Sequence, residues 1–82
     1  MLTEYTIQTL TALAEAYEGC IPLHHEGIAQ VRTDDELQVY IDLEDGTTLL
    51  PAQADERQVN EAIMQWRDTH GAYFQKIIGS MM

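Results

Sequence analysis

The segment ELQVYIDLEDGTTLLP, residues 36–51, constrains the fold more than any other part of the chain. Apolar and polar residues alternate over 37–44, which is typical of a strand with one buried and one exposed face. Asp45 and Gly46 follow and favour a type I′ hairpin turn, which needs a positive φ at both central residues. We therefore expect a strand over 37–44 and a returning strand over 47–50, which ends at Pro51 because proline lacks a ladder donor.

The two faces of this expected strand differ in chemistry. The buried set is Leu37, Val39, Ile41 and Leu43, and the exposed set is Gln38, Tyr40, Asp42 and Glu44. The exposed set is acidic and contains no basic residue. This acidity serves either solubility or binding, and both interpretations stay open. In either case, reversing the charge of Asp42 and Glu44 should change the stability by no more than about 0.5 kcal/mol each.

Helical spacing of apolar residues predicts two helices around the strands. The first covers about 3–18 and ends at Gly19, where a left-handed residue is expected. The second begins after Asp55, with Gln58 completing a capping box, and continues to about residue 78. Its apolar stripe keeps its phase across Gly71, so one long helix is expected and a break at His70-Gly71 is the lesser alternative. Residues 79–82 are expected to fray.

The segment between the first helix and the alternating strand is expected to hold a linker, a strand near 28–32 and a turn at 33–35. The predicted order is therefore α-β-β-β-α. This is a single α+β domain over residues 1–82, with a three-stranded antiparallel meander packed against an N-terminal and a long C-terminal helix. The predicted core is Leu10, Leu13, Leu37, Val39, Ile41, Leu43, Ile63, Trp66 and Phe74.

Residues with catalytic or metal-binding chemistry are few. His24, His25 and Glu26 are adjacent, but neighbouring side chains of an extended segment point in opposite directions, and the third ligand would have to come from a distant residue such as His70. Cys20 near His24 is a conceivable nucleophile pair, yet a lone cysteine at a helix end is more often a packed apolar residue. Abundant carboxylates on exposed turns lack the desolvated cleft that acid–base chemistry needs. We expect no enzyme activity, no cofactor and no bound metal.

The charge distribution is the strongest functional feature. The chain carries 14 acidic against 4 basic residues, a formal net charge of −10, and residues 33–56 contain eight acids without a Lys or Arg. Such a surface repels free nucleic acid and anionic membranes, so a charged partner should be a basic protein surface. A single cysteine, and an N-terminal segment without basic residues or an unbroken apolar run, favour a cytoplasmic location.

We therefore expect a small acidic non-enzymatic binding protein that occupies a basic surface of a protein partner. The residues predicted to bind are Asp34, Asp35, Glu36, Tyr40, Asp42, Glu44 and Asp45. One specific form is a nucleic-acid-mimicking inhibitor or an accessory factor from a phage or mobile element. A duplex carries one charge per about 1.7 Å of axis, so a single chain would be a partial mimic. The alternative is an assembly subunit that forms a homo-oligomer, such as a homodimer, through Tyr73, Ile77 and Ile78 of its last helix, with the acids serving solubility only.

Overall fold

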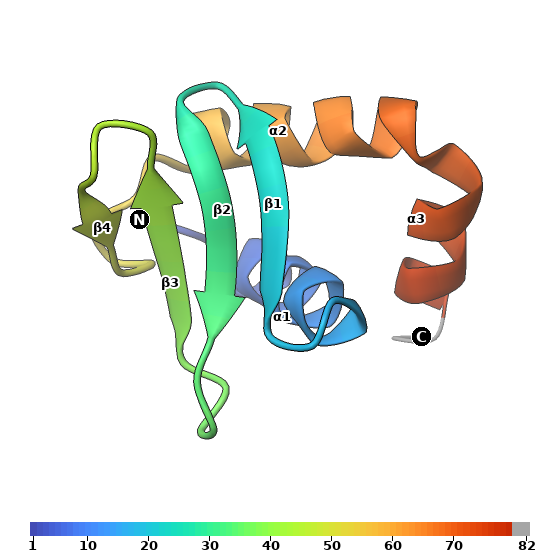
Figure 1. Cartoon of the computed structure of the whole chain (residues 1–82), viewed down its shortest axis with the longest axis horizontal. Helices are drawn as coiled ribbons and strands as arrows, with labels where there is room; N and C mark the ends of the chain where they lie inside the picture. Colours follow the sequence, from blue (N-terminus) through green and yellow to red (C-terminus); the bar gives the residue numbers. More distant parts are fainter. Residues whose placement is uncertain (80–82) are drawn as a thin grey trace.

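The computed structural model describes residues 1–79 and shows a helix, a four-stranded sheet and two further helices (Figure 1). The elements are α1 (Glu4–Ala16), β1 (Cys20–His25), β2 (Ile28–Thr33), β3 (Val39–Leu43), β4 (Thr48–Leu49), α2 (Glu56–Thr69) and α3 (Gly71–Gly79). The strands are antiparallel in the order β1-β2-β3-β4. The predicted α+β class with a strand meander is confirmed.

Helices α1 and α2 pack on one face of the sheet, and no helix of residues 1–79 covers the other face (Figure 1). Of the predicted core, Leu10, Leu13, Val39, Ile41, Ile63 and Trp66 are buried, while Leu43 and Phe74 are partly buried against them. Buried side chains also come from β1, β2 and α3, including Ile21, Leu23, Ile28, Val31, Ile77 and Ile78. The apolar face of the sheet and both helices thus form one core.

The segment before Ile28, predicted as a linker, contains the edge strand β1, so the prediction of three strands is wrong. Buried Ile21 and Leu23 alternate with exposed residues along β1, and Ile21 lies opposite Val31. Pro22 hid this signal, because proline usually argues against a strand. At a sheet edge the N–H group that proline lacks is not needed for pairing within the sheet. Pro22 also makes this edge less able to pair with a strand of another chain.

Leu37 is not part of β3 and not part of the core. The strand begins at Val39, and Leu37 lies in the β2–β3 hairpin with φ +62° and 54% of its surface exposed. Its N–H donates to the carbonyl of Asp34 at 3.0 Å, which closes the turn. The alternating pattern therefore predicted a strand that begins too early, because Leu37 belongs to a tight turn and not to the strand.

The β3–β4 hairpin lies where the sequence predicted it, but its turn type differs. Only Gly46 has a positive φ, at +94°, whereas a type I′ turn needs one at Asp45 as well. The Leu43 N–H donates to the Thr47 carbonyl and the Gly46 N–H to the Leu43 carbonyl. The connection is thus a three-residue loop with glycine at its left-handed position, another common hairpin.

The last helical region consists of two helices, so the lesser alternative of a break at His70-Gly71 is correct. His70 ends α2 by donating its N–H to the Trp66 carbonyl, and α3 then turns to pack against α1 (Figure 1). The turn places the ring centroids of Tyr73 on α3 and Tyr17 5.8 Å apart. This aromatic contact favours the break between α2 and α3. Gly79 belongs to α3 rather than to a frayed end, and residues 80–82 lie outside the described residues.

Candidate functional site

The uncovered face of the sheet, which we call the open face, carries an ion pair at its centre. Arg32 on β2 contacts Asp42 on β3, with Nε to Oδ2 at 2.6 Å and Nη2 to Oδ1 at 3.2 Å. Gln30 and Thr48 donate to the same carboxylate at 2.8 and 2.7 Å. These donors, Arg32 first, hold the pKa of Asp42 at about 2. Asp42 is therefore a fully hydrogen-bonded part of the sheet.

The exposed side chains of β3 itself include no basic residue, but the neighbouring strand β2 places Arg32 at the centre of the open face. Arg32 lies opposite Tyr40, and Gln30 opposite Asp42, so Arg32 reaches Asp42 along the diagonal. The sequence of one strand identifies only the side chains of that strand. Which charged side chains of the neighbouring strand lie beside them depends on the pairing register.

Tyr40, predicted as an anchor for a partner, is held by contacts within the chain. Its hydroxyl donates to Asp34 Oδ2 at 3.1 Å, and the Arg32 guanidinium lies 4.9 Å from the ring centroid. The hydrogen bond to Asp34 is the main cause that raises the pKa of Tyr40. The ring therefore forms a partly exposed, fixed surface between the centre of the sheet and the β2–β3 hairpin.

The β2–β3 hairpin extends beyond the body of the molecule and displays three successive acids (Figure 1). Asp34 organises it: its Oδ1 accepts from the N–H groups of Glu36 and Gln38, each at 2.9 Å. The Gln38 N–H is the main cause that lowers the pKa of Asp34. Asp35 and Glu36 are exposed. Asp34 is thus the structural acid of the hairpin, and its two neighbours present free surface charge.

A groove of about 320 Å³ lies at the base of this hairpin. Its lining residues are Glu15, Glu18, Gly19, Thr33, Asp34, Asp35 and Leu37, and none of them is basic. Thr33 Oγ1 donates to Glu15 Oε1 at 3.0 Å, which ties the end of α1 to β2. The acids Glu15, Glu18, Asp34, Asp35 and Glu36 form what we call the hairpin cluster. Glu15 and Glu18 were not predicted as members, because only the tertiary fold brings the end of α1 to this hairpin.

A second group of acids lies at the opposite end of the sheet. The Glu44 N–H donates to the Gly27 carbonyl at 2.9 Å, so the β3–β4 and β1–β2 turns lie side by side (Figure 1). The Asp45 carboxylate accepts a hydrogen bond from the Thr47 N–H within the same turn. This hydrogen bond is the main cause that lowers the pKa of Asp45. Glu26 accepts from Gln65 Nε2 at 2.6 Å. We call Glu26, Glu44 and Asp45 the turn cluster.

The residues considered as candidate metal ligands lie in different surroundings. His24 is exposed with φ +54°, and His70 stacks on Trp66 with ring centroids 4.4 Å apart. Within residues 1–79, no three His, Cys, Asp or Glu side chains are grouped so as to hold a metal ion. Cys20 is exposed, and its Sγ lies 3.3 Å from Gln30 Oε1.

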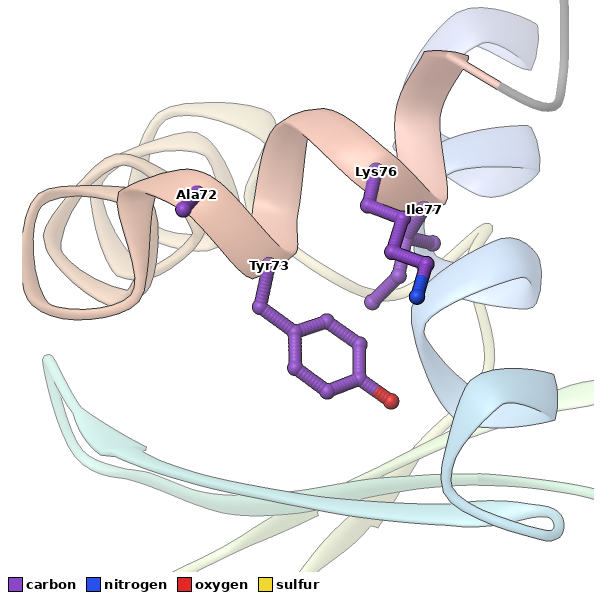
Figure 2. A pocket seen from close by; sticks show the side chains of 4 residues that line it. All are labelled: Ala72, Tyr73, Lys76 and Ile77. Atoms are coloured by element: carbon purple, nitrogen blue, oxygen red, sulfur yellow. The ribbon is translucent and has the colours of Figure 1, made fainter.

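The predicted oligomer interface is largely covered within the chain. Ile77 and Ile78 are each 8% exposed, because α3 folds back against α1, whereas Tyr73 is 45% exposed. An apolar groove of about 500 Å³ is lined by Ala72, Tyr73, Lys76 and Ile77. Figure 2 shows the side chains of Tyr73 and Lys76 extending from the same side of α3. Of the three predicted interface residues, only Tyr73 offers substantial exposed surface.

Comparison with known protein families, with curated proteins and with solved structures found no match. Across the described part of the chain, no helix has both the length and the apolar character needed to cross a membrane.

Proposed function

We propose that this chain is a small non-enzymatic binding protein that occupies a basic surface of a protein partner. The observation that carries the proposal is the hairpin cluster. Four of its five acids come from two distant segments and line one groove that has no basic lining residue. Like charges brought together by folding destabilise the compact state. A chain selected only for solubility would gain from spreading these acids over its surface.

Electrostatics makes such a surface useful for association. Complementary charge steers diffusional encounter and raises the association rate, and it selects against partners of the same sign. Leu37 adds an exposed apolar side chain on the lining of the same groove. An apolar contact surrounded by charge is typical of a protein interface with a dry centre and a polar rim.

The carboxylates of these clusters support binding rather than acid–base chemistry. General acids at neutral pH need a pKa raised by burial or by a like charge. Hydrogen bonds lower the pKa of Asp34 and Asp45 instead. These groups remain ionised at neutral pH, as a charged binding surface requires.

A nucleic-acid-mimicking inhibitor, or an accessory factor from a phage or mobile element, is a narrower form of the same proposal. It would need a continuous acidic row, whereas Arg32 neutralises Asp42 at the centre of the sheet. The geometry therefore favours a basic protein surface in general over a duplex-binding groove. A cytoplasmic location belongs to this proposal, supported by the single cysteine.

The test begins with capture of basic proteins from the native host lysate at low and at moderate salt, followed by rate measurements on the purified partner. The variant Asp35→Lys with Glu36→Lys reverses exposed charge without removing the hydrogen bonds of Asp34. We expect a slower association and a weaker salt dependence. The control is Glu61→Lys with Asp68→Lys on α2, which changes the net charge equally. Equal weakening by both pairs would show that only bulk charge matters, and would refute an acidic binding site.

A homo-oligomer formed through α3 is the second candidate, favoured by exposed Tyr73 beside the apolar groove. In that case light scattering at high concentration should give a dimeric mass, and Tyr73→Ser should reduce it. A monomeric mass at every concentration would remove this candidate.

A further inference from the structure

We infer that two copies of this chain exchange α3, so that α3 of each copy packs on α1 of the other. In the exchanged form, α2 and α3 join into one straight helix at His70. Contacts that α3 makes within one chain are then made between two chains, which is domain swapping. This inference concerns buried contacts and does not depend on the proposed binding of a basic partner.

A single residue separates α2 from α3. α2 ends at Thr69 and α3 begins at Gly71, and the chain turns at His70 between them (Figure 1). His70 has φ −122° and ψ 37°, which differ by about 60° and 80° from the values of an α-helix. A change of conformation at this one residue therefore joins the two helices. Short connections of this kind favour exchange between copies, whereas longer ones let the segment pack on its own chain.

The hinge gains backbone hydrogen bonds when it becomes straight. The bonds on both sides of His70 already have α-helical spacing: its N–H donates to the Trp66 carbonyl at 2.9 Å, and its carbonyl accepts from the Phe74 N–H at 2.8 Å. In a continuous helix the N–H groups of residues 71–73 would also pair with the carbonyls of residues 67–69. These additional bonds favour the straight form at the hinge.

The apolar stripe of this region also fits a straight helix. It steps alternately by four and three residues across the break, through Val59, Ile63, Trp66, His70, Tyr73 and Ile77. Such spacing is typical of a long helix that packs along one side. Two helices that turn at His70 do not need a common phase, whereas one continuous helix does. The bent and the straight form are thus both compatible with the sequence.

A straight helix requires a second copy to cover it. Joined together, residues 56–79 would form a helix of about 36 Å, whereas the longest extent of the molecule is 30 Å. α3 would then leave α1 of its own chain and expose Ile77 and Ile78, which are each 8% exposed in the bent form. Exposure of these apolar side chains to water is unfavourable. The vacated surface of α1 on a second copy restores their burial.

The exchanged α3 would meet the same side chains as it does in the bent form. Tyr73 stacks on Tyr17 with ring centroids 5.8 Å apart, and it approaches Trp66 edge to face at 6.4 Å. Both forms contain these contacts, so their contributions cancel. The equilibrium therefore depends on the hinge and on the protein concentration.

The local charge permits this contact between copies. Residues 56–79 contain three basic and three acidic residues, a balance of zero, although the whole chain has a net charge of −10. The two copies thus meet through a segment without net charge. Salt screens the repulsion between the remaining acidic surfaces, so it should increase the dimer fraction.

Two hinge variants test the inference by light scattering over a range of concentrations. Gly71→Ala raises the helix propensity at the hinge and should increase the dimer association constant about tenfold. Its control, Gly79→Ala, adds the same methyl group at the other end of α3 and should change the constant by less than about twofold. Insertion of two glycines between His70 and Gly71 should remove the dimer, because α3 can then return to its own α1. Circular dichroism checks that each variant is folded.

Cross-linking identifies the contact that joins the copies. In the Gly71→Ala background, one chain carries Tyr17→Cys and the other Tyr73→Cys, both with Cys20→Ser so that each has one thiol. The two chains are mixed and treated with a short bismaleimide, and mass spectrometry identifies the linked peptides. Exchange should give a link between positions 17 and 73 of different chains.

The outcomes separate exchange from other forms of association. A monomeric mass for Gly71→Ala at every concentration would overturn the inference. A dimer that survives the glycine insertion, or that lacks the link between positions 17 and 73, would overturn it as well. A link between two copies of position 73 would instead support association through the exposed side of Tyr73. None of these results depends on a basic partner, so the proposed function is tested separately.

Discussion

Arg32 on β2 and Asp42 on β3 form a bidentate ion pair, with Nε to Oδ2 at 2.6 Å and Nη2 to Oδ1 at 3.2 Å. The pair divides the acidic surface into two clusters, because it neutralises the one acid at the centre of the open face. Four hydrogen bonds from three side chains reach this carboxylate, so its charge also contributes to folding.

The first prediction is that Asp42→Asn makes stability less dependent on pH in the acidic range. The pKa of Asp42 is about 2 in the folded protein and about 3.9 in an unfolded chain. A lowered pKa contributes stability that is complete above about pH 4 and is lost as the pH falls towards 2. The contribution is on the order of 1–2 kcal/mol after allowance for screening of the partly exposed Arg32. Urea unfolding between pH 2 and 7 measures it. An unchanged pH slope in the variant would contradict the assignment, and Glu44→Gln is the control.

The second prediction separates Asp42 from Glu44 under charge reversal. Asp42→Lys places two cations together and removes the acceptor of Gln30 and Thr48, so it should destabilise the fold by about 2–3 kcal/mol. Glu44→Lys lies on an exposed turn and should change stability by less than about 0.5 kcal/mol. We therefore keep the sequence-based expectation of a small effect for Glu44 and replace it for Asp42. Chemical denaturation of both variants tests the contrast, which fails if the two midpoints coincide.

The third prediction is that Leu37→Gly stabilises the protein. Leu37 has φ +62°, a conformation that costs an L-residue about 1 kcal/mol and costs glycine nothing. Because the side chain is 54% exposed, little apolar burial is lost. We expect a gain of about 0.5 kcal/mol in the free energy of unfolding. Gln38→Gly is the control and should destabilise. A lower midpoint for Leu37→Gly would show that the side chain contributes more than its conformation costs.

The fourth prediction concerns Glu56, which joins the N-terminal segment to the start of α2. Its carboxylate accepts from the Thr3 N–H at 3.0 Å, from Thr6 Oγ1 at 2.6 Å and from Asn60 Nδ2 at 2.7 Å. The Thr6 hydroxyl is the main cause that lowers the pKa of Glu56, so this stability is present above the usual glutamate pKa and is lost on acidification. Glu56→Ala should cost about 1–3 kcal/mol. Hydrogen exchange in the first turn of α1 should rise, whereas Glu61→Ala should leave it unchanged.

The fifth prediction is that the purified protein contains no stoichiometric transition metal. His24 is exposed, and His70 is stacked on Trp66, so they do not form a ligand set with Glu26. Elemental analysis checks this directly. One zinc per chain that disappears in His24→Ala would contradict it.

The sequence determined the elements whose signals are local. Alternation over Val39–Leu43, the glycine at Gly46 and the Asp55 cap are properties of a few neighbouring residues, and the structure contains the strand, hairpin and helix start that they predict. The acidic run of Asp34, Asp35 and Glu36 was likewise evident. The sequence did not predict β1, because Pro22 and two histidines made the alternation of Ile21 and Leu23 hard to recognise as a strand. It favoured a continuous helix at Gly71, because the apolar stripe continues across that residue.

The tertiary structure decided which side chains meet. Strand register placed Arg32 beside Asp42, the turn at Gly71 buried Ile77 and Ile78, and the end of α1 brought Glu15 and Glu18 to the β2–β3 hairpin. Each of these depends on contacts between residues far apart in the chain. Periodicity and turn chemistry report only on the nearest residues, so the number of acids was visible in the sequence, whereas their division into two clusters required the fold.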